Sequence, residues 1–234
     1  MGRTRSLDDG APGAAGDASV SDAGRRDVSR DTRQPEVRAP EMGRIGSLDD
    51  GAPGAAGDAS VGPGGGFATA TIFVTSSQYS GSAVGGLAGA DASCRAAALA
   101  GGLANASHYV ALMSDSATNA VDRFSVSGDI RLTDGALVAA SSADLWSTGV
   151  MVRVNRTETG VYVGMHLAWT GTQPSGVGHG MAPGDFCQDW TSDSGGVETG
   201  RTDRSDDGWV AIYFPEGPCN ACSNPGGIYC IGPR

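Results

Sequence analysis

The positions of the five cysteines constrain this chain more than any other feature. Cys94 stands alone in an Ala-rich stretch, and the other four, Cys187, Cys219, Cys222 and Cys230, lie near the end. A lone early cysteine and a late cluster favour long-range disulfides that tie the start of a domain to its finish. Such bonds persist outside the cytoplasm. We therefore predict a disulfide-stabilised domain that is extracellular or lies at the cell surface.

The composition changes sharply near residue 66. Residues 1–66 contain no aromatic and few large apolar side chains, and residues 1–20 recur almost unchanged as residues 42–61. A tandem repeat without an apolar face cannot stack into a solenoid. Too little apolar surface is available there to offset the conformational entropy of folding. We predict a disordered low-complexity tether over 1–66, which would allow surface tethering, and one folded domain over 67–234.

The charge and hydropathy patterns exclude several classes of partner. The net charge is −10, and the excess of acidic residues lies mostly in 67–234, so no nucleic-acid partner is expected. No apolar run approaches the roughly 20 residues of a membrane span. No signal peptide is visible at the start. Because the cysteines indicate export, we expect the true start to lie upstream of this Met1 and the assigned start site to be wrong.

Residues 67–234 combine a few helical segments with many short β-branched runs. A helix is expected over 87–103 and a shorter one over 117–124. The expected strands are 70–75, 109–113, 130–132, 136–138, 161–163, 167–170, 209–213 and 228–231. Gly, Ser and Asp dominate 171–186 and 191–208. The pattern predicts an α+β fold with one or two helices, short and mostly antiparallel strands, and long loops.

Several ordered motifs in this region resemble a bacterial family of secreted or surface domains of unknown function with a C-type lectin-like (endostatin-like) fold. The motifs are Ile72–Tyr79, Gly86–Cys94, Tyr109–Ser116, Asn155–Glu158, Trp169–Thr172, Cys187–Ser192 and Ile228–Cys230. The resemblance implies an outer disulfide, Cys94–Cys230, and an inner one from Cys187 to a cysteine near the end. Either Cys219 or Cys222 can be that partner, and a local bridge between these two is an alternative. The spacing common in C-type lectins favours Cys222 and leaves Cys219 as the spare cysteine.

The calcium site of the lectins in this fold class is not expected here. The stretch Gln173-Pro174-Ser175 is similar to their Gln-Pro-Asp loop, but Ser175 replaces the acidic ligand. Val210 follows Trp209 where those lectins carry an Asn after a Trp. Calcium requires 6–8 oxygen ligands. We therefore expect no cofactor and no metal, calcium included.

Catalytic motifs are weak in this chain. Asp193-Ser194-Gly195-Gly196 matches the core of a trypsin-type nucleophile motif, but no histidine lies in the context that a catalytic triad requires, so we interpret it as a turn. Cys219-Asn-Ala-Cys222 lacks a second pair for zinc. Glu158, Glu198 and Glu216 are the only glutamates of the domain, and none stands in an apolar context. The protein is therefore predicted not to be an enzyme.

The sequence predicts a recognition or adhesion module that binds an extracellular glycan, in carbohydrate binding, or a protein ligand. The candidate surface is the long loop 171–186, with Trp169, Gln173, His179 and Asp185 as ligand-binding residues. Loops held by a rigid scaffold are where binding residues concentrate. The competing hypotheses are a secreted hydrolase whose site is not recognised, and a purely structural surface protein.

Overall fold

The computed structural model describes residues 66–179, 185–212 and 220–234. The chain divides into two units, Met1–Gly54 and Ala55–Arg234, and everything described below belongs to the second. The predicted tether with its repeat lies outside the described residues, apart from Gly66. Cys219 lies outside them as well.

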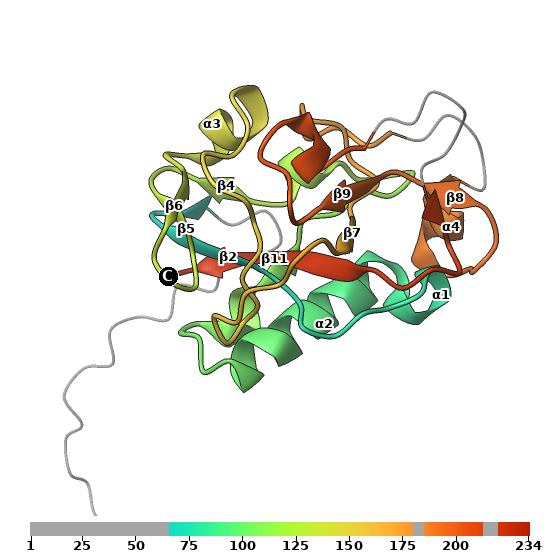
Figure 1. The fold of residues 1–234 in the computed structure, drawn as a ribbon, viewed down its shortest axis with the longest axis horizontal. Helices are drawn as coiled ribbons and strands as arrows, with labels where there is room; N and C mark the ends of the chain where they lie inside the picture. The colour runs from blue at the N-terminus through green and yellow to red at the C-terminus, as the bar shows by residue number, and fades with distance from the viewer. Residues whose placement is uncertain (1–65, 180–184, 213–219) are drawn as a thin grey trace, which may run out of the picture. The chain divides into compact units, whose positions relative to one another are not determined.

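The strand β11 (Gly227–Pro233) is the centre of the main sheet (Figure 1). Along one edge it pairs antiparallel with β2 (Ala70–Val74). Along the other edge it pairs parallel with β7 (Leu167–Trp169) and antiparallel with β3 (Val110–Ala111). All five residues of β2 are buried. The apolar runs that predicted these strands are therefore the innermost part of the fold, which is why their sequence signal is strong.

The sheet continues outward on both sides of this centre. Beyond β2 lie β5 (Ile130–Leu132) and β6 (Leu137–Ala139), and beyond β7 lies β9 (Thr199–Arg201). The pairs β2–β5, β7–β11 and the short pair β1 (Gly66–Phe67) with β4 (Ser125–Val126) are parallel. The other pairs are antiparallel, including β8 (Gly196–Val197) with β10 (Asn220–Ala221). The domain is thus an α+β fold with short, mostly antiparallel strands.

The helix α2 (Gly86–Ala100) is the longest helix of the described residues and runs along one side of the central strands (Figure 1). Ala90, Cys94 and Ala98 recur every fourth residue and form its buried face. These small side chains allow the helix to lie close to β3 and β11. Gly102 ends it with φ +66°, and Leu103 N donates to Ala98 O at 2.9 Å. The predicted helix over 87–103 is confirmed with small shifts at both ends.

Two apolar clusters fill the fold. One surrounds Trp209 and Tyr229, and the other lies around α2, Trp169 and Trp190. The disulfide Cys94–Cys230 joins α2 to β11, and Cys187–Cys222 joins α4 (Asp185–Trp190) to the chain after β10. All four cysteines are fully buried. These are the two pairs that the resemblance implied.

Short helical elements account for the remaining differences from the expectations. The expected strand over 209–213 is wrong, because the 3₁₀ turn η3 (Asp207–Trp209) occupies its start, with the Asp206 side chain accepting from Gly208 N. Trp209 is buried there without strand pairing. The expected strand over 161–163 is reduced to one bridge, Arg156–Tyr162. The expected helix over 117–124 is the 3₁₀ turn η2 (Ala120–Asp122).

Three further elements were not predicted. The helix α3 (Ser142–Ser147) begins at Ser141, whose side chain accepts from Asp144 N. The other two, α1 (Gly81–Val84) and the 3₁₀ turn η1 (Ala106–His108), flank α2. Each is six residues or shorter, and a short apolar run gives too little periodicity to identify a helix.

The turn α4 is left-handed. Residues 186–190 all have φ between +52° and +65°, and none of them is a glycine. The left-handed conformation costs an L-residue roughly 1–2 kcal/mol. It persists because its neighbours hold it: the Cys187–Cys222 bond fixes one side, and Asp189 accepts hydrogen bonds from the backbone N–H and the hydroxyl of Ser116.

None of the described helices is long and apolar enough to cross a membrane. The two disulfides fit a protein that acts outside the reducing cytoplasm.

Candidate functional site

A small hairpin over residues 171–179 follows β7 and contains most of the predicted binding loop. Thr172 and Gly178 form its antiparallel bridge. Gly176 N donates to Gln173 O at 2.8 Å, so Pro174 occupies the second position of the turn, which its fixed φ suits. Gly176 has φ +82°, and a Cβ on it would lie 2.7 Å from Val121 and 2.8 Å from Trp146. The hairpin is therefore an ordered element that packs closely on the domain.

A hydrogen-bond network around Ser114 anchors this hairpin. The Ser114 hydroxyl lies 2.9 Å from that of Thr172 and accepts from Ala120 N. Its carbonyl accepts from Trp190 Nε1 at 2.8 Å. Asn119 Oδ1 accepts from Gly178 N at 3.0 Å. Because Ser114 and Thr172 are fully buried, these bonds position the loop backbone and are closed to a ligand.

The polar pair His179–Glu198 lies where the hairpin meets the chain before β9. His179 Nδ1 is 2.8 Å from Glu198 Oε1. The Glu198 side chain is 7% exposed and that of His179 is 28% exposed, so the histidine is the accessible member. Glu198 Oε2 has no hydrogen-bond donor among the described residues. A buried carboxylate oxygen without a donor is costly. This pair is the part of the molecule best suited to accept a hydrogen bond from a ligand.

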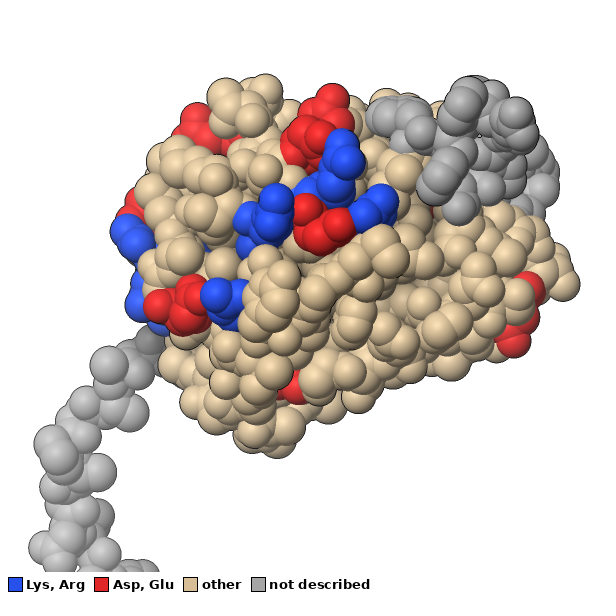
Figure 2. All heavy atoms as spheres, in the orientation of Figure 1, with Lys and Arg blue, Asp and Glu red and all other residues tan. Residues whose placement is uncertain are grey.

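A pocket of about 530 Å³ opens at the other end of β9. It is lined by Arg201, Arg204, Asp206, Asp207, Gly208, Ala211 and Ile212. Figure 2 shows arginine and acidic side chains alternating over the region of β9, while much of the rest of that face is uncharged. The walls thus combine planar charged groups with aliphatic surface, a combination typical of small-ligand sites.

Ion pairs fix the charged walls of this pocket. Arg201 donates through Nε and Nη2 to the two Asp203 oxygens at 2.9 and 2.6 Å. Arg204 makes the same forked contact with Asp206. The hydrogen bonds from Arg201 lower the pKa of Asp203, and those from Arg204 lower the pKa of Asp206. Both carboxylates therefore stay ionised near neutral pH, and their planes are held in place for a ligand.

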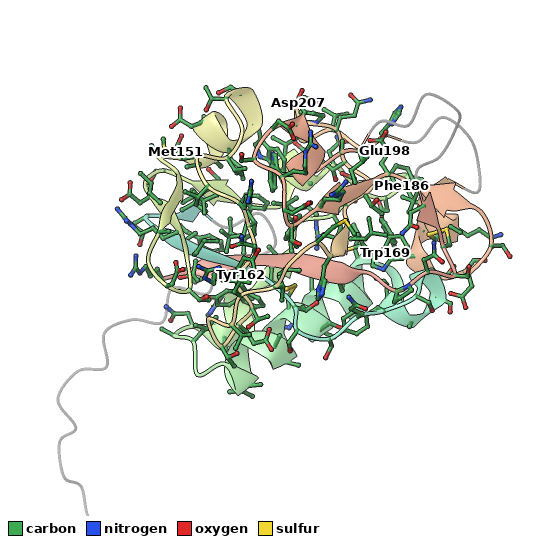
Figure 3. The ribbon with its side chains drawn as sticks, in the orientation of Figure 1. Met151, Tyr162, Trp169, Phe186, Glu198 and Asp207 are labelled. Carbon is green, nitrogen blue, oxygen red and sulfur yellow. A yellow bond between two sulfur atoms is a disulfide. The ribbon has the colours of Figure 1, made fainter. Side chains whose placement is uncertain are left out.

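The structure separates the four predicted binding residues. Gln173 and His179 lie half-exposed on the 171–179 hairpin. Trp169 is fully buried, and its Nε1 donates to Tyr79 O at 2.7 Å (Figure 3). It therefore packs in the core and does not face a ligand, contrary to the expectation. The side chain of Asp185 lies outside the described part of the chain.

The reading of the glutamates from sequence context was wrong. Glu158 and Glu198 are both nearly buried. Glu158 accepts from the backbone N–H and the hydroxyl of Ser76, which satisfies it. Glu198 is the functional candidate that sequence reasoning missed (Figure 3). Its neighbours Val197 and Thr199 gave only a weak signal, because its burial comes from the distant hairpin 171–179.

The protease-like motif forms a bend. Ser194 is exposed, and Gly195 has φ +92°. Asp193 accepts from Ser82 N at 2.9 Å, and hydrogen bonds from Ser82 and Ser80 lower the pKa of Asp193. In the described residues no hydrogen bond joins Ser194 to a histidine. The motif therefore ties the bend to the start of α1.

Metal-binding groups were also sought in the described residues, where no set of three or more His, Cys, Asp or Glu side chains could hold an ion. A comparison with models of protein families finds no match for this chain. A comparison with curated proteins likewise finds no match.

Proposed function

We propose that residues 66–234 form an extracellular recognition domain of C-type lectin-like (endostatin-like) architecture, as in the bacterial secreted or surface family that the sequence resembles. The mixed sheet around β11, the few helices and the two buried disulfides support this proposal. The long loops of the domain are anchored on that scaffold, as in the Ser114 network. An anchored loop suits recognition, because little entropy remains to be lost on binding.

The proposed binding surface extends from His179 and Gln173 on the hairpin, past Glu198, to the pocket at the end of β9. The observation that carries the proposal is Glu198 Oε2, a buried acceptor without a donor among the described residues. A ligand hydroxyl would supply that donor. The surrounding surface offers forked arginine–carboxylate pairs, which can donate to and accept from further hydroxyls. This chemistry favours a glycan over a protein ligand at this surface.

The ligand is expected to bind without the calcium site of the classical lectins. Ser175 stands where that site needs a carboxylate and is exposed at the tip of the hairpin. A hydroxyl is a weak ligand for calcium compared with a carboxylate. Affinity would then come from hydrogen bonds and from contacts with the pocket walls.

The test is binding of the domain to a panel of glycans and matrix proteins, with and without a calcium chelator. We expect glycan binding that survives the chelator. Glu198→Gln should weaken it roughly tenfold or more, because a hydrogen bond to an ionised group is lost. His179→Ala should weaken it by a smaller factor. Leu99→Ser, on the outer face of α2, is the matched surface control.

Each other outcome would contradict a defined part of the proposal. Binding lost with the chelator would indicate a calcium site. Cleavage of a panel member, abolished by Glu198→Gln, would identify a hydrolase. No binding to any member by a folded domain would favour a purely structural surface protein.

A further inference from the structure

The segment that joins α3 to β7 exposes an unusual number of large apolar side chains. Six such side chains are exposed among the described residues, and four of them lie in this segment. They are Met151, Val161, Tyr162 and Met165, each between 59% and 64% exposed. Val152 and Val154 face the core instead. Because these inward residues already anchor the segment, packing does not explain the outward ones.

Residues 155–163 of this segment form a hairpin at the edge of the sheet. Val74 N, at the end of β2, donates to Arg156 O at 2.9 Å. On the other side of Arg156, Thr157 N donates to Val161 O and Val163 N donates to Asn155 O, at 2.9 and 3.0 Å. The hairpin therefore extends the sheet outward from β2, and 161–163 is its outermost run (Figure 3).

This outermost run leaves its outer edge open. In the Arg156–Tyr162 bridge, the hydrogen bonds come from the residues on either side of Tyr162. The N–H and C=O of Tyr162 must then point away from the hairpin, and they make no hydrogen bond within the described residues. A Cβ placed on Gly164 would meet no atom within 4 Å, so the space beside the backbone is open there. Open edges of this kind can pair with another strand.

The side chains beside this edge are held and carry positive charge. The Arg156 guanidinium lies 5.2 Å from the centre of the Tyr162 ring, and its Nε donates to Asp134 at 2.7 Å. The tyrosine ring is therefore held in place, which reduces the entropy lost on binding. Arg153 is exposed and has no acidic partner in the described part of the chain. The domain carries more acidic than basic residues, so an unpaired arginine here is distinctive.

We propose that the 161–163 edge receives an extended segment of another protein, which adds as a strand and places an apolar side chain against Tyr162 and a carboxylate near Arg153. Main-chain hydrogen bonds give affinity in this mode, and side chains give specificity. Tyr and Arg are the residues that most often dominate binding at protein interfaces. The thioether and aliphatic groups of Met165 and Val161 offer nothing to sugar hydroxyls. A second copy of the same edge would bring like charges together. The site does not depend on the glycan surface proposed above.

The experiment selects peptides that bind residues 66–234 from a displayed library of random dodecapeptides. We expect enriched peptides to carry an apolar residue close to Asp or Glu. A synthetic copy should lose roughly tenfold or more in affinity with Tyr162→Ala and with Arg153→Glu, which are typical effects at dominant interface residues. Tyr162→Phe and Leu99→Ser should retain it. N-methylation of the peptide should abolish binding at alternate positions only, because every second amide faces the edge.

Three outcomes would overturn the proposal. Enriched peptides whose binding is unchanged by Tyr162→Ala would place the contact elsewhere. Self-association of the domain that is lost in Tyr162→Ala would make the partner a second copy. Glycan binding lost in Tyr162→Ala but retained in Glu198→Gln would make this edge a carbohydrate surface. Thermal unfolding of each variant shows whether it remains folded, and Arg153→Glu, at an exposed position, keeps the test available if Tyr162→Ala does not.

Discussion

Tyr229, in the middle of β11, is the residue whose chemistry the fold alters most. It is fully buried against Trp209, with ring centroids 5.8 Å apart. Its hydroxyl has no hydrogen-bond partner in the described part of the chain. Burial, with a smaller contribution from the charge of Asp203, raises its pKa far above the usual tyrosine range. The ring therefore contributes packing, while the hydroxyl contributes a desolvation cost.

Tyr229→Phe should leave the free energy of unfolding unchanged at pH 7, or raise it by about 1 kcal/mol, because an unpaired buried hydroxyl is removed. Above about pH 10 an unfolded tyrosine loses its proton, whereas folded Tyr229 keeps it. The stability of the wild type therefore falls with pH beyond that point, and the variant should gain about 1.4 kcal/mol relative to it at pH 11. Urea unfolding followed by circular dichroism at both pH values measures this, with Cys219→Ser in both proteins to prevent thiol exchange. A loss of stability at pH 7 would show that the hydroxyl is bonded.

Individual site residues differ in how far the sequence could predict them. His179 and Gln173 could be predicted, because glycines and a proline around them indicate an accessible turn. Trp169 could not be assigned correctly, since a tryptophan in a loop-rich region reads the same whether it packs in a core or faces a ligand. Glu198 could not be found at all. Its burial depends on the contact between its own backbone carbonyl and Gly171, 27 positions earlier, and local context carries no trace of that contact.

Elements were predictable where burial and periodicity agree. The strands at 70–75 and 228–231 and the helix at 87–103 have long apolar or Ala-rich patterns, and the structure contains all three. The run Trp209–Ile212 also looks like a strand, yet its start is a turn, because the Asp206 cap and close contact with Gly200 bury it without pairing. A Cβ on Gly200 would lie 2.0 Å from Trp209 O. Apolar content alone predicts burial and does not determine the backbone that achieves it.

The left-handed turn α4 gives an element-scale prediction with a distinctive sign. Gln188 is exposed and has φ +52° and ψ +57°. Gly adopts this conformation without steric cost, so Gln188→Gly should raise the free energy of unfolding by about 1 kcal/mol. In a right-handed helix the same change would lower it by about that amount. Urea unfolding decides between them, with Gln188→Ala as the control that shortens the side chain but keeps the Cβ. A lower stability for the glycine variant would contradict the left-handed turn.

At the scale of the whole molecule, the two apolar clusters are tied together by covalent bonds and by shared strands. The cluster around α2 contains all four bonded cysteines, whereas the cluster around Trp209 contains none. The strand β11 belongs to both, through Tyr229 and Ile231 on one side and Ile228 and Cys230 on the other. The loops that carry the two proposed binding surfaces extend from this bonded framework, so a ligand would meet a scaffold whose elements cannot separate easily.

The two disulfides should therefore contribute unequally to global stability. Cys94–Cys230 closes a sequence separation of 136 residues and Cys187–Cys222 one of 35. The entropy removed from the unfolded chain predicts losses of about 5 and about 4 kcal/mol when the pairs are replaced by alanines. The longer bond also joins the first long helix to the central strand, so its loss should expose the whole α2 cluster. Loss of the shorter bond should first open α4, whose left-handed backbone it holds.

Urea unfolding of Cys94→Ala/Cys230→Ala and Cys187→Ala/Cys222→Ala, together with amide exchange of both, tests this order. Exchange should rise across α2 and β11 in the first variant and chiefly over residues 186–190 in the second, because opening starts where the constraint is removed. Peptide mapping without reduction verifies the pairing in the parent protein. A larger cost for the shorter loop would mean that strain released in α4, and not chain entropy, decides how strongly each bond stabilises the domain.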